Sequence, residues 1–81
     1  MRIRRTPQFT RTYDLVPAQI QKAFDRKVSL LVQNLRHPSL PAKKYDEARD
    51  IWQARVNGGW RFYFSIEGDT YILHSLRPHP K

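Results

Sequence analysis

The residues of this chain best placed to do chemistry are two arginines in its C-terminal half. Arg55 and Arg61 stand on either side of the Asn57-Gly58-Gly59 segment, which is a strong signal for a β-hairpin. On paired strands the two arginines lie opposite each other, where like charges repel at a cost of roughly a few tenths of a kcal/mol or more. Our hypothesis is that an anion, such as a phosphate group, binds between the two side chains.

The overall charge of the chain agrees with an anionic partner. Its 81 residues include 15 Lys and Arg against 7 Asp and Glu, which gives a formal charge of +8. So much charge on a small body sets up a positive field over its surface. The natural partners are therefore polyanions: nucleic acid, an acidic protein or an anionic membrane surface. The length allows one domain, residues 1–81.

Several classes of protein are excluded by what the sequence lacks. It contains no cysteine, which excludes a disulfide framework, a thiolate metal site and a cysteine nucleophile. The three histidines have no metal-ligand spacing, and no carboxylate cluster accompanies them. No apolar run is long enough to span a membrane, and the basic N-terminus lacks the apolar stretch of a signal peptide. We expect a cytoplasmic protein without a metal, a small-molecule cofactor or a membrane partner.

The N-terminal half has the pattern of a short strand followed by two helices. Residues 2–5 favour a strand, and Thr6-Pro7 is a helix start, with threonine as the N-cap and proline at the first helical position. This first helix is expected to run from Pro7 to about Leu15. Pro17 opens a longer helix, which ends in the proline-containing stretch 34–41. Its apolar face is made by Ile20, Phe24, Val28, Leu31 and Leu35.

From residue 51 the apolar pattern changes to period two, which predicts three strands over residues 51–56, 60–66 and 71–76. One face of these strands is apolar and is expected to meet the helices: Trp52, Ala54, Val56, Trp60, Phe62, Phe64, Ile66, Tyr71 and Leu73. The other face carries the polar and charged side chains: Gln53, Arg55, Arg61, Tyr63 and His74. The expected fold class is α+β, an N-terminal strand, two helices and a C-terminal antiparallel three-stranded meander, forming one sheet with the helices packed on one face.

Matching of the apolar faces also predicts the turns. It favours a three-residue loop at residues 57–59, with Val56 opposite Trp60 and Gly59 in a left-handed conformation. It favours a two-residue turn at Gly68-Asp69. The second turn predicts two cross-strand pairs: Phe64 with Leu73, and Tyr63 with His74.

The order of elements and several local motifs resemble the RelE/ParE toxin superfamily, the small basic toxins of bacterial toxin–antitoxin modules. The motifs are Arg36-His37-Pro38-Ser39-Leu40 after the long helix, Lys43-Lys44, the hairpin Arg55…Gly59-Trp60-Arg61, and a last strand ending in HSLRPH. The resemblance implies a ribosome-dependent endoribonuclease that cuts mRNA without a metal. The attacking group is the substrate's own 2′-OH, and the products are a 2′,3′-cyclic phosphate and a 5′-OH.

The resemblance also implies roles for individual residues. The two basic positions of the first hairpin strand fall on Gln53, which is neutral here, and Arg55, and the arginine of the second strand falls on Arg61. The position after the last strand falls on His79 or Arg77; the chain reaches Lys81 before the tyrosine typical of the family. Arg61 and Arg55 are expected to hold the scissile phosphate, and His79 to transfer protons with Arg77 as its substitute. The residues expected to bind RNA are Lys43, Lys44, Gln53, Tyr63 and His74.

The partners implied are a cognate antitoxin protein, the ribosome and mRNA. Two other functions stay open. One is a ParE-like toxin that acts on DNA gyrase without cutting nucleic acid, and the other is a catalytically silent RNA-binding module.

Structural interpretations compete with the functional ones at several residues. His74 is alternatively a strand residue hydrogen-bonded to Tyr63, and His37 belongs to the turn that ends the helix. Trp52 and Trp60 are expected in the core. Lys43 and Lys44 are expected in a basic loop, and residues 46–50 in a solvated stretch or a short helical turn.

Overall fold

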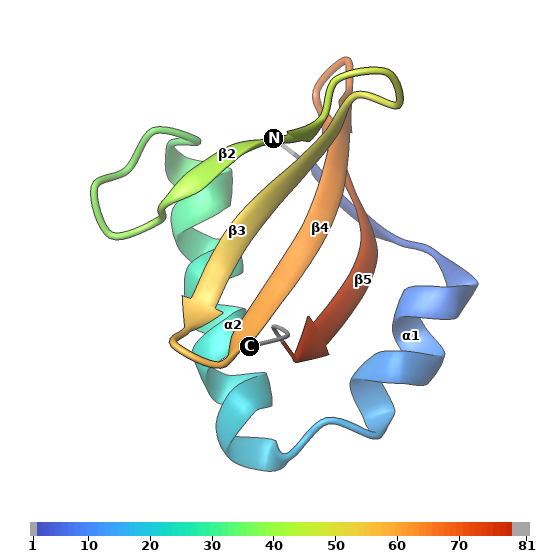
Figure 1. Ribbon diagram of the computed structural model, residues 1–81, viewed down its shortest axis with the longest axis vertical. Helices are drawn as coiled ribbons and strands as arrows, with labels where there is room; N and C mark the ends of the chain where they lie inside the picture. Colours follow the sequence, from blue (N-terminus) through green and yellow to red (C-terminus); the bar gives the residue numbers. More distant parts are fainter. Residues whose placement is uncertain (1, 79–81) are drawn as a thin grey trace.

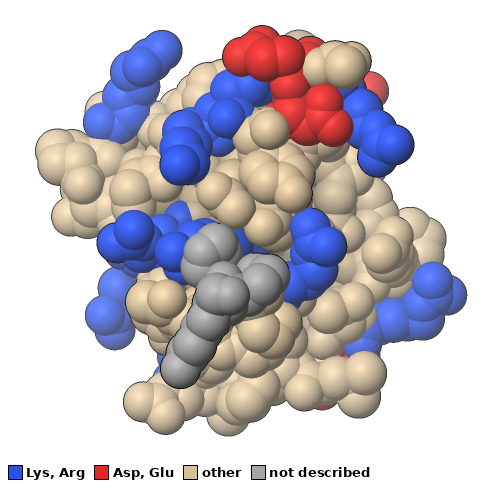
Figure 2. Space-filling model, in the orientation of Figure 1, with Lys and Arg blue, Asp and Glu red and all other residues tan. Residues whose placement is uncertain are grey.

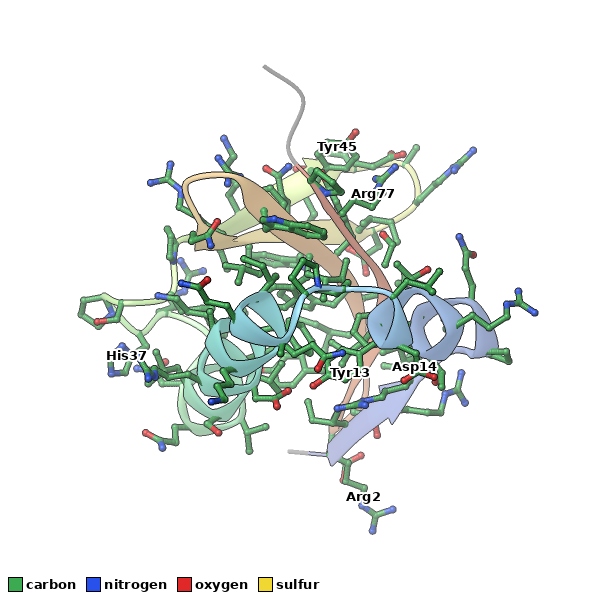
Figure 3. The ribbon with its side chains drawn as sticks, turned by 90° about the horizontal axis from the view of Figure 1, so that it is seen from below. Arg2, Tyr13, Asp14, His37, Tyr45 and Arg77 are labelled. Carbon is green, nitrogen blue, oxygen red and sulfur yellow. The ribbon has the colours of Figure 1, made fainter. Side chains whose placement is uncertain are left out.

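The computed structural model describes residues 2–78, which form a five-stranded sheet with two helices packed on one face (Figures 1 and 3). The elements in chain order are β1 (Arg2–Arg5), α1 (Pro7–Asp14), α2 (Ala18–Gln33), β2 (Ala42–Asp46), β3 (Ile51–Asn57), β4 (Trp60–Glu67) and β5 (Thr70–Pro78). The strand order across the sheet is β1-β5-β4-β3-β2. β1 is parallel to β5, and the other neighbours are antiparallel. The α+β architecture expected from the sequence is confirmed.

Both helices begin as the sequence predicts. The hydroxyl of Thr6 caps α1 by accepting a hydrogen bond from the backbone N–H of Phe9 at 3.1 Å, and Pro7 occupies the first helical position. α2 begins directly after Pro17, and its Phe24 and Leu31 are buried against the sheet. In the described part of the chain, neither helix combines the length and the apolar character that crossing a membrane requires.

Aromatic side chains join the helices to the sheet. The ring of Phe24 on α2 lies 5.3 Å from Phe9 on α1 and 5.1 Å from Phe62 on β4, centroid to centroid. Phe62 in turn stacks on Phe64 at 5.6 Å. Every residue predicted for the apolar face of the meander either belongs to this core or packs against it. Close packing of this kind resists deformation, so it supports the opposite face of the sheet as a rigid platform.

The β3–β4 hairpin has the predicted pairing over most of its length. Arg55 lies opposite Arg61, and Gln53 lies opposite Tyr63. The turn differs, because Asn57 pairs with Trp60 across a two-residue Gly58-Gly59 connection and the extra residue is a bulge within β3. The three-residue loop and the left-handed Gly59 were therefore wrong. The bulge absorbs the odd residue, so the apolar side chains on both sides of it stay on the helix face.

The β4–β5 hairpin confirms the two-residue turn at Gly68-Asp69, with Gly68 at φ 59°, and the pairing of Phe64 with Leu73. The predicted pairing of Tyr63 with His74 is wrong. Tyr63 lies opposite Ser75, because His74 is the extra residue of a bulge in β5. Period-two reasoning assumes an unbroken register, and a bulge shifts it by one residue.

The strand β2 was missed by the sequence analysis. Residues 42–46 were assigned to a basic loop and the start of a solvated stretch, but they pair with β3, Lys43 lying opposite Gln53. This five-residue edge strand, AKKYD, has no apolar alternation. It is held by backbone hydrogen bonds to β3 rather than by an apolar stripe of its own, so the usual strand signal is absent.

Candidate nucleic-acid interface

The face of the sheet turned away from the helices, here called the open face, carries a row of cations. Arg55 on β3 lies opposite Arg61 on β4, and Arg61 lies opposite Arg77 on β5. We call these three residues the arginine row. Figure 2 looks onto this face and shows Lys and Arg side chains across its middle, with acidic side chains gathered at its upper edge. The pairing of β3, β4 and β5 thus sets three guanidinium groups side by side across the sheet.

The arginine row has no carboxylate partner among residues 2–78. The ion pairs of this part of the chain involve other cations: Arg2 with Asp69, Lys44 with Asp50, and Arg49 with Asp46. Arg61 is oriented by two backbone carbonyls, because its Nη1 donates to Asn57 O at 2.9 Å and Trp60 O at 3.1 Å. These acceptors carry no formal charge, so no side chain or backbone group of residues 2–78 neutralises the positive charge of the row.

A hollow of about 220 Å³ lies beside the row, and we call it the cationic hollow. Its lining consists of Pro41, Lys43, Gln53, Arg55 and Arg61. Three of these five side chains are cationic and none is acidic. Several converging charged donors are what a phosphate group requires, because each can form a short charge-assisted hydrogen bond to a phosphate oxygen.

Tyr63 separates the cationic hollow from a second one. It is only 7% exposed although it belongs to the open face. Its hydroxyl accepts a hydrogen bond from Gln53 Nε2 at 2.9 Å, and Cζ of Arg77 lies 4.5 Å from its ring centroid. The ring of Tyr45 meets it edge-on at 5.0 Å. Tyr63 is thus fixed in place by an amide, a cation and an aromatic ring.

The second hollow, of about 240 Å³, is lined by Tyr63 and by residues on both sides of it, from β2 to β5, and we call it the aromatic hollow. Its walls include Tyr45 and Asp46 from β2, and Tyr63, His74, Ser75 and Arg77 from β4 and β5. Arg49 and Ile51 complete the lining, so this hollow combines two arginines and one carboxylate with two tyrosines, whereas the cationic hollow has no aromatic and no acidic side chain.

No family model and no curated protein matches this chain. Several solved structures do. A YoeB/ParE toxin from Agrobacterium tumefaciens superposes with a TM-score of 0.83 at 13% identity, over 99% of this chain and 100% of that one. The YoeB dimer from Staphylococcus aureus gives 0.80 at 14% identity, over 99% and 98% of the two chains. The RelB–RelE antitoxin–toxin complex from Methanococcus jannaschii gives 0.75 at 21%, over 93% and 88%.

This chain has the fold of the RelE and YoeB toxins. The resemblance inferred from the sequence is confirmed at the level of the fold. Within this RelE/YoeB fold, the arginine row and both hollows lie on the open face, and the helices α1 and α2 cover only the other face.

The two histidines of the predicted site fall in different places. His74 is brought to the aromatic hollow, but its Nε2 lies 2.8 Å from Ser65 Oγ, so its expected hydrogen bond to Tyr63 is replaced by one to the serine. His79, the predicted proton carrier, lies outside the described residues.

The Lys43-Lys44 pair is split between the two faces of the sheet. Lys43 points to the cationic hollow. Lys44 lies opposite Trp52 on the helix face, with its Nζ 5.0 Å from that ring centroid, and it forms an ion pair with Asp50. The hydrogen bond to the Asp50 carboxylate raises the pKa of Lys44. Successive residues of a strand face opposite sides, so the structure does not bring Lys44 together with the other predicted RNA-binding residues.

Two other predictions are confirmed. His37 belongs to the turn after α2, where its Nδ1 accepts a hydrogen bond from Ser39 N at 3.0 Å. Trp52 and Trp60 pack against the core. A larger hollow of about 340 Å³ lies beside this turn, between residues 35 and 42 and Trp52. It shares Pro41 with the cationic hollow but contains neither Arg55 nor Arg61.

Sequence reasoning missed Tyr45 and Asp46 as parts of the site. Tyr45 was passed over, and Asp46 was assigned to a solvated stretch. The available signal was a lone aromatic residue inside the basic segment AKKYD. The lone aromatic residue predicts a part of the site only when the segment is recognised as a strand, because Tyr45 then lies on the same face as Lys43.

Proposed function

We propose that this protein is the toxin of a toxin–antitoxin pair and that it cuts mRNA on the ribosome as an endoribonuclease. The observation that carries the proposal is the arginine row beside a hollow free of acidic side chains. The fold supports it, because the proteins that share this fold include toxins and antitoxin–toxin complexes.

The proposed reaction is a transesterification at one phosphate of the mRNA. The 2′-oxygen attacks phosphorus while its proton passes to a base, and the bond between phosphorus and the 5′-oxygen breaks. The leaving 5′-oxygen takes up a proton. The products are a 2′,3′-cyclic phosphate and a 5′-OH, so atoms and charge balance without an oxidant or a further reactant. Negative charge develops on the phosphate oxygens in the transition state, and fixed cations stabilise it.

We assign the stabilisation of this negative charge to the arginines. Arg55, Arg61 and Lys43 line the hollow in which the scissile phosphate is proposed to sit. Arg61 is already held by its two carbonyl contacts, so it loses little side-chain freedom when it binds. Removing one such donor from a preorganised site lowers the rate by about 10²–10³ in well-studied enzymes.

Proton transfer is assigned to histidine. Arg77 keeps its charge at neutral pH, because a guanidinium does not release its proton. We therefore place Arg77 with Arg61 in charge stabilisation, rather than as a substitute base. His79 is the proposed proton carrier, and His74, which lines the aromatic hollow, is the second candidate.

The proposed protein partner is an antitoxin with an acidic segment that covers the arginine row. The formal charge of +8 and the lack of carboxylate partners for the row among residues 2–78 support it. Such a segment competes with RNA for the same cations, so its binding would silence the toxin.

Primer extension on a reporter mRNA in a translating extract tests the proposed activity. The wild-type protein should produce discrete cuts at particular codons, and Arg61→Ala should reduce them by about a hundredfold or more. Arg26→Ala, an exposed cation on α2, is the matched control and should cut like the wild type. Absence of cuts with the wild type, or full activity of Arg61→Ala, would contradict the proposal. A change in gyrase-dependent supercoiling without RNA cuts would support the ParE-like function instead.

A further inference from the structure

Two β-bulges deliver side chains to the aromatic hollow from opposite sides. The register of β2 shifts between Lys44 and Asp46, so that Tyr45 and Asp46 both line the hollow. The register of β5 shifts at His74, so that His74 and Ser75 both line it as well. A regular strand would turn one residue of each pair to the helix face. Bulges that re-aim side chains in this way are over-represented beside functional sites.

The hollow has a preoriented aromatic wall. Tyr45 is 57% exposed, and its ring meets Tyr63 edge-on at an interplanar angle of 67°. Tyr63 is itself fixed by Gln53 and Arg77. Figure 3 shows Tyr45 and Arg77 close together on the side of the sheet away from the helices. An exposed ring that is held in one orientation can stack on a flat ligand with little further loss of entropy.

The remaining lining suits a flat ligand with polar edges. Ile51 adds an apolar contact, while Ser75, His74 and the carboxylate of Asp46 offer hydrogen-bonding groups at the margin. Arg49 and Arg77 line the hollow too, and Arg49 Nε lies 3.8 Å from the Asp46 carboxylate, so the charge of that carboxylate is offset within the hollow. A heteroaromatic ring with N–H donors at its edge combines the required flatness and polarity.

The two hollows are adjacent. Gln53 lines the cationic hollow and Tyr63 lines the aromatic hollow, and the hydrogen bond between them is 2.9 Å long. In single-stranded RNA, a base and a backbone phosphate also lie next to each other, so one strand could place its base in one hollow and its phosphate in the other. We propose that the aromatic hollow binds a nucleobase, stacked on Tyr45, of the RNA whose phosphate occupies the cationic hollow. The identification of the ligand as RNA rests on the proposed function.

The test uses a short single-stranded 2′-O-methyl RNA, which cannot be cleaved because it lacks the attacking hydroxyl, and the same backbone made of abasic residues. Wild-type protein should bind the base-containing strand more tightly than the abasic one. Tyr45→Ala should weaken binding of the base-containing strand at least about fivefold, which is the low end of base–aromatic stacking, and leave abasic binding unchanged. Tyr45→Phe should bind both strands like the wild type, because it keeps the ring.

Leu15→Ala is the matched control, since Leu15 is 87% exposed and distant from the hollow. Thermal melting confirms that each variant is folded. The proposal is overturned if wild-type protein binds both strands equally or neither measurably, or if Tyr45→Ala keeps wild-type affinity for the base-containing strand.

Cleavage in the translating extract separates this inference from the proposed function. If binding depends on the bases and on Tyr45 but no mRNA is cut, the base site is supported and the nuclease function is contradicted. Cuts by Tyr45→Ala at the same codons and rate as the wild type would retain the nuclease and reject the base site.

Discussion

Arg55, Arg61 and Arg77 stand where the stability of the sheet alone does not explain them. Adjacent strands place Arg61 between the other two, and like charges directly opposite each other destabilise a sheet by roughly 0.2–1 kcal/mol a pair. Most of the surrounding surface could carry these charges without such repulsion. A site that binds an anion explains why they are gathered, because stability is commonly lower where function requires strained or repelling groups.

Replacing one arginine of the row should therefore stabilise the fold while it weakens RNA binding. For Arg55→Gln we expect the free energy of unfolding to rise by roughly a few tenths of a kcal/mol at low salt, with the gain disappearing at high salt. Urea denaturation at two salt concentrations measures it. Arg26→Gln on α2 is the control and should show a smaller salt-dependent change. A clear loss of stability in Arg55→Gln would contradict the account.

The elements of this fold differ in how readily the sequence reveals them. The β3–β4 pairing of Arg55 with Arg61 could be predicted, because apolar alternation fixes which residues share a face. The bulges at Tyr45 and His74 could not, because they break that alternation by one residue at positions that composition does not mark. As a result, the arginines were found from the sequence, whereas Tyr45, Asp46 and Ser75 of the aromatic hollow were not.

The start of α1 is an element whose contribution can be measured. Thr6 caps the helix through its hydroxyl, and its backbone N–H donates to Leu73 O on β5 at 3.2 Å. Thr6→Ala should lower the free energy of unfolding by about 1 kcal/mol, because the N–H of Phe9 loses its partner. Thr6→Ser, which keeps the hydroxyl, should cost much less in the same denaturation experiment. Equal effects of the two substitutions would contradict the capping role.

The strand β5 should also make the fold sensitive to alkali. Burial raises the pKa of Tyr71 above the ordinary tyrosine value. As the pH rises past about 10, the unfolded chain loses this proton before the folded one, so stability that is complete at lower pH declines from there upward. Tyr71→Phe should show a shallower decline in melting temperature, while Tyr45→Phe, with an exposed ring, should keep the wild-type decline. An identical decline in Tyr71→Phe would reject this cause.

At the scale of the whole molecule, acidic and basic side chains are separated along the open face. Acidic residues gather at the turns before β3 and before β5, among them Glu47, Asp50 and Asp69. The arginine row lies near the β3–β4 turn, at the other end of these strands. Together with the formal charge of +8, this separation is expected to orient an approaching polyanion, such as the proposed RNA, toward the cationic hollow and away from the acidic turns.

The most direct measurement of the central claim is the salt dependence of binding to single-stranded 2′-O-methyl RNA. If the arginine row holds phosphates, the logarithm of the affinity falls linearly with the logarithm of the salt concentration, by about 0.7 for each phosphate contact. Arg61→Ala should reduce that slope by about 0.7, and Arg26→Ala should leave it unchanged. A slope near zero for the wild type, or the same slope in Arg61→Ala, would contradict a phosphate-binding arginine row.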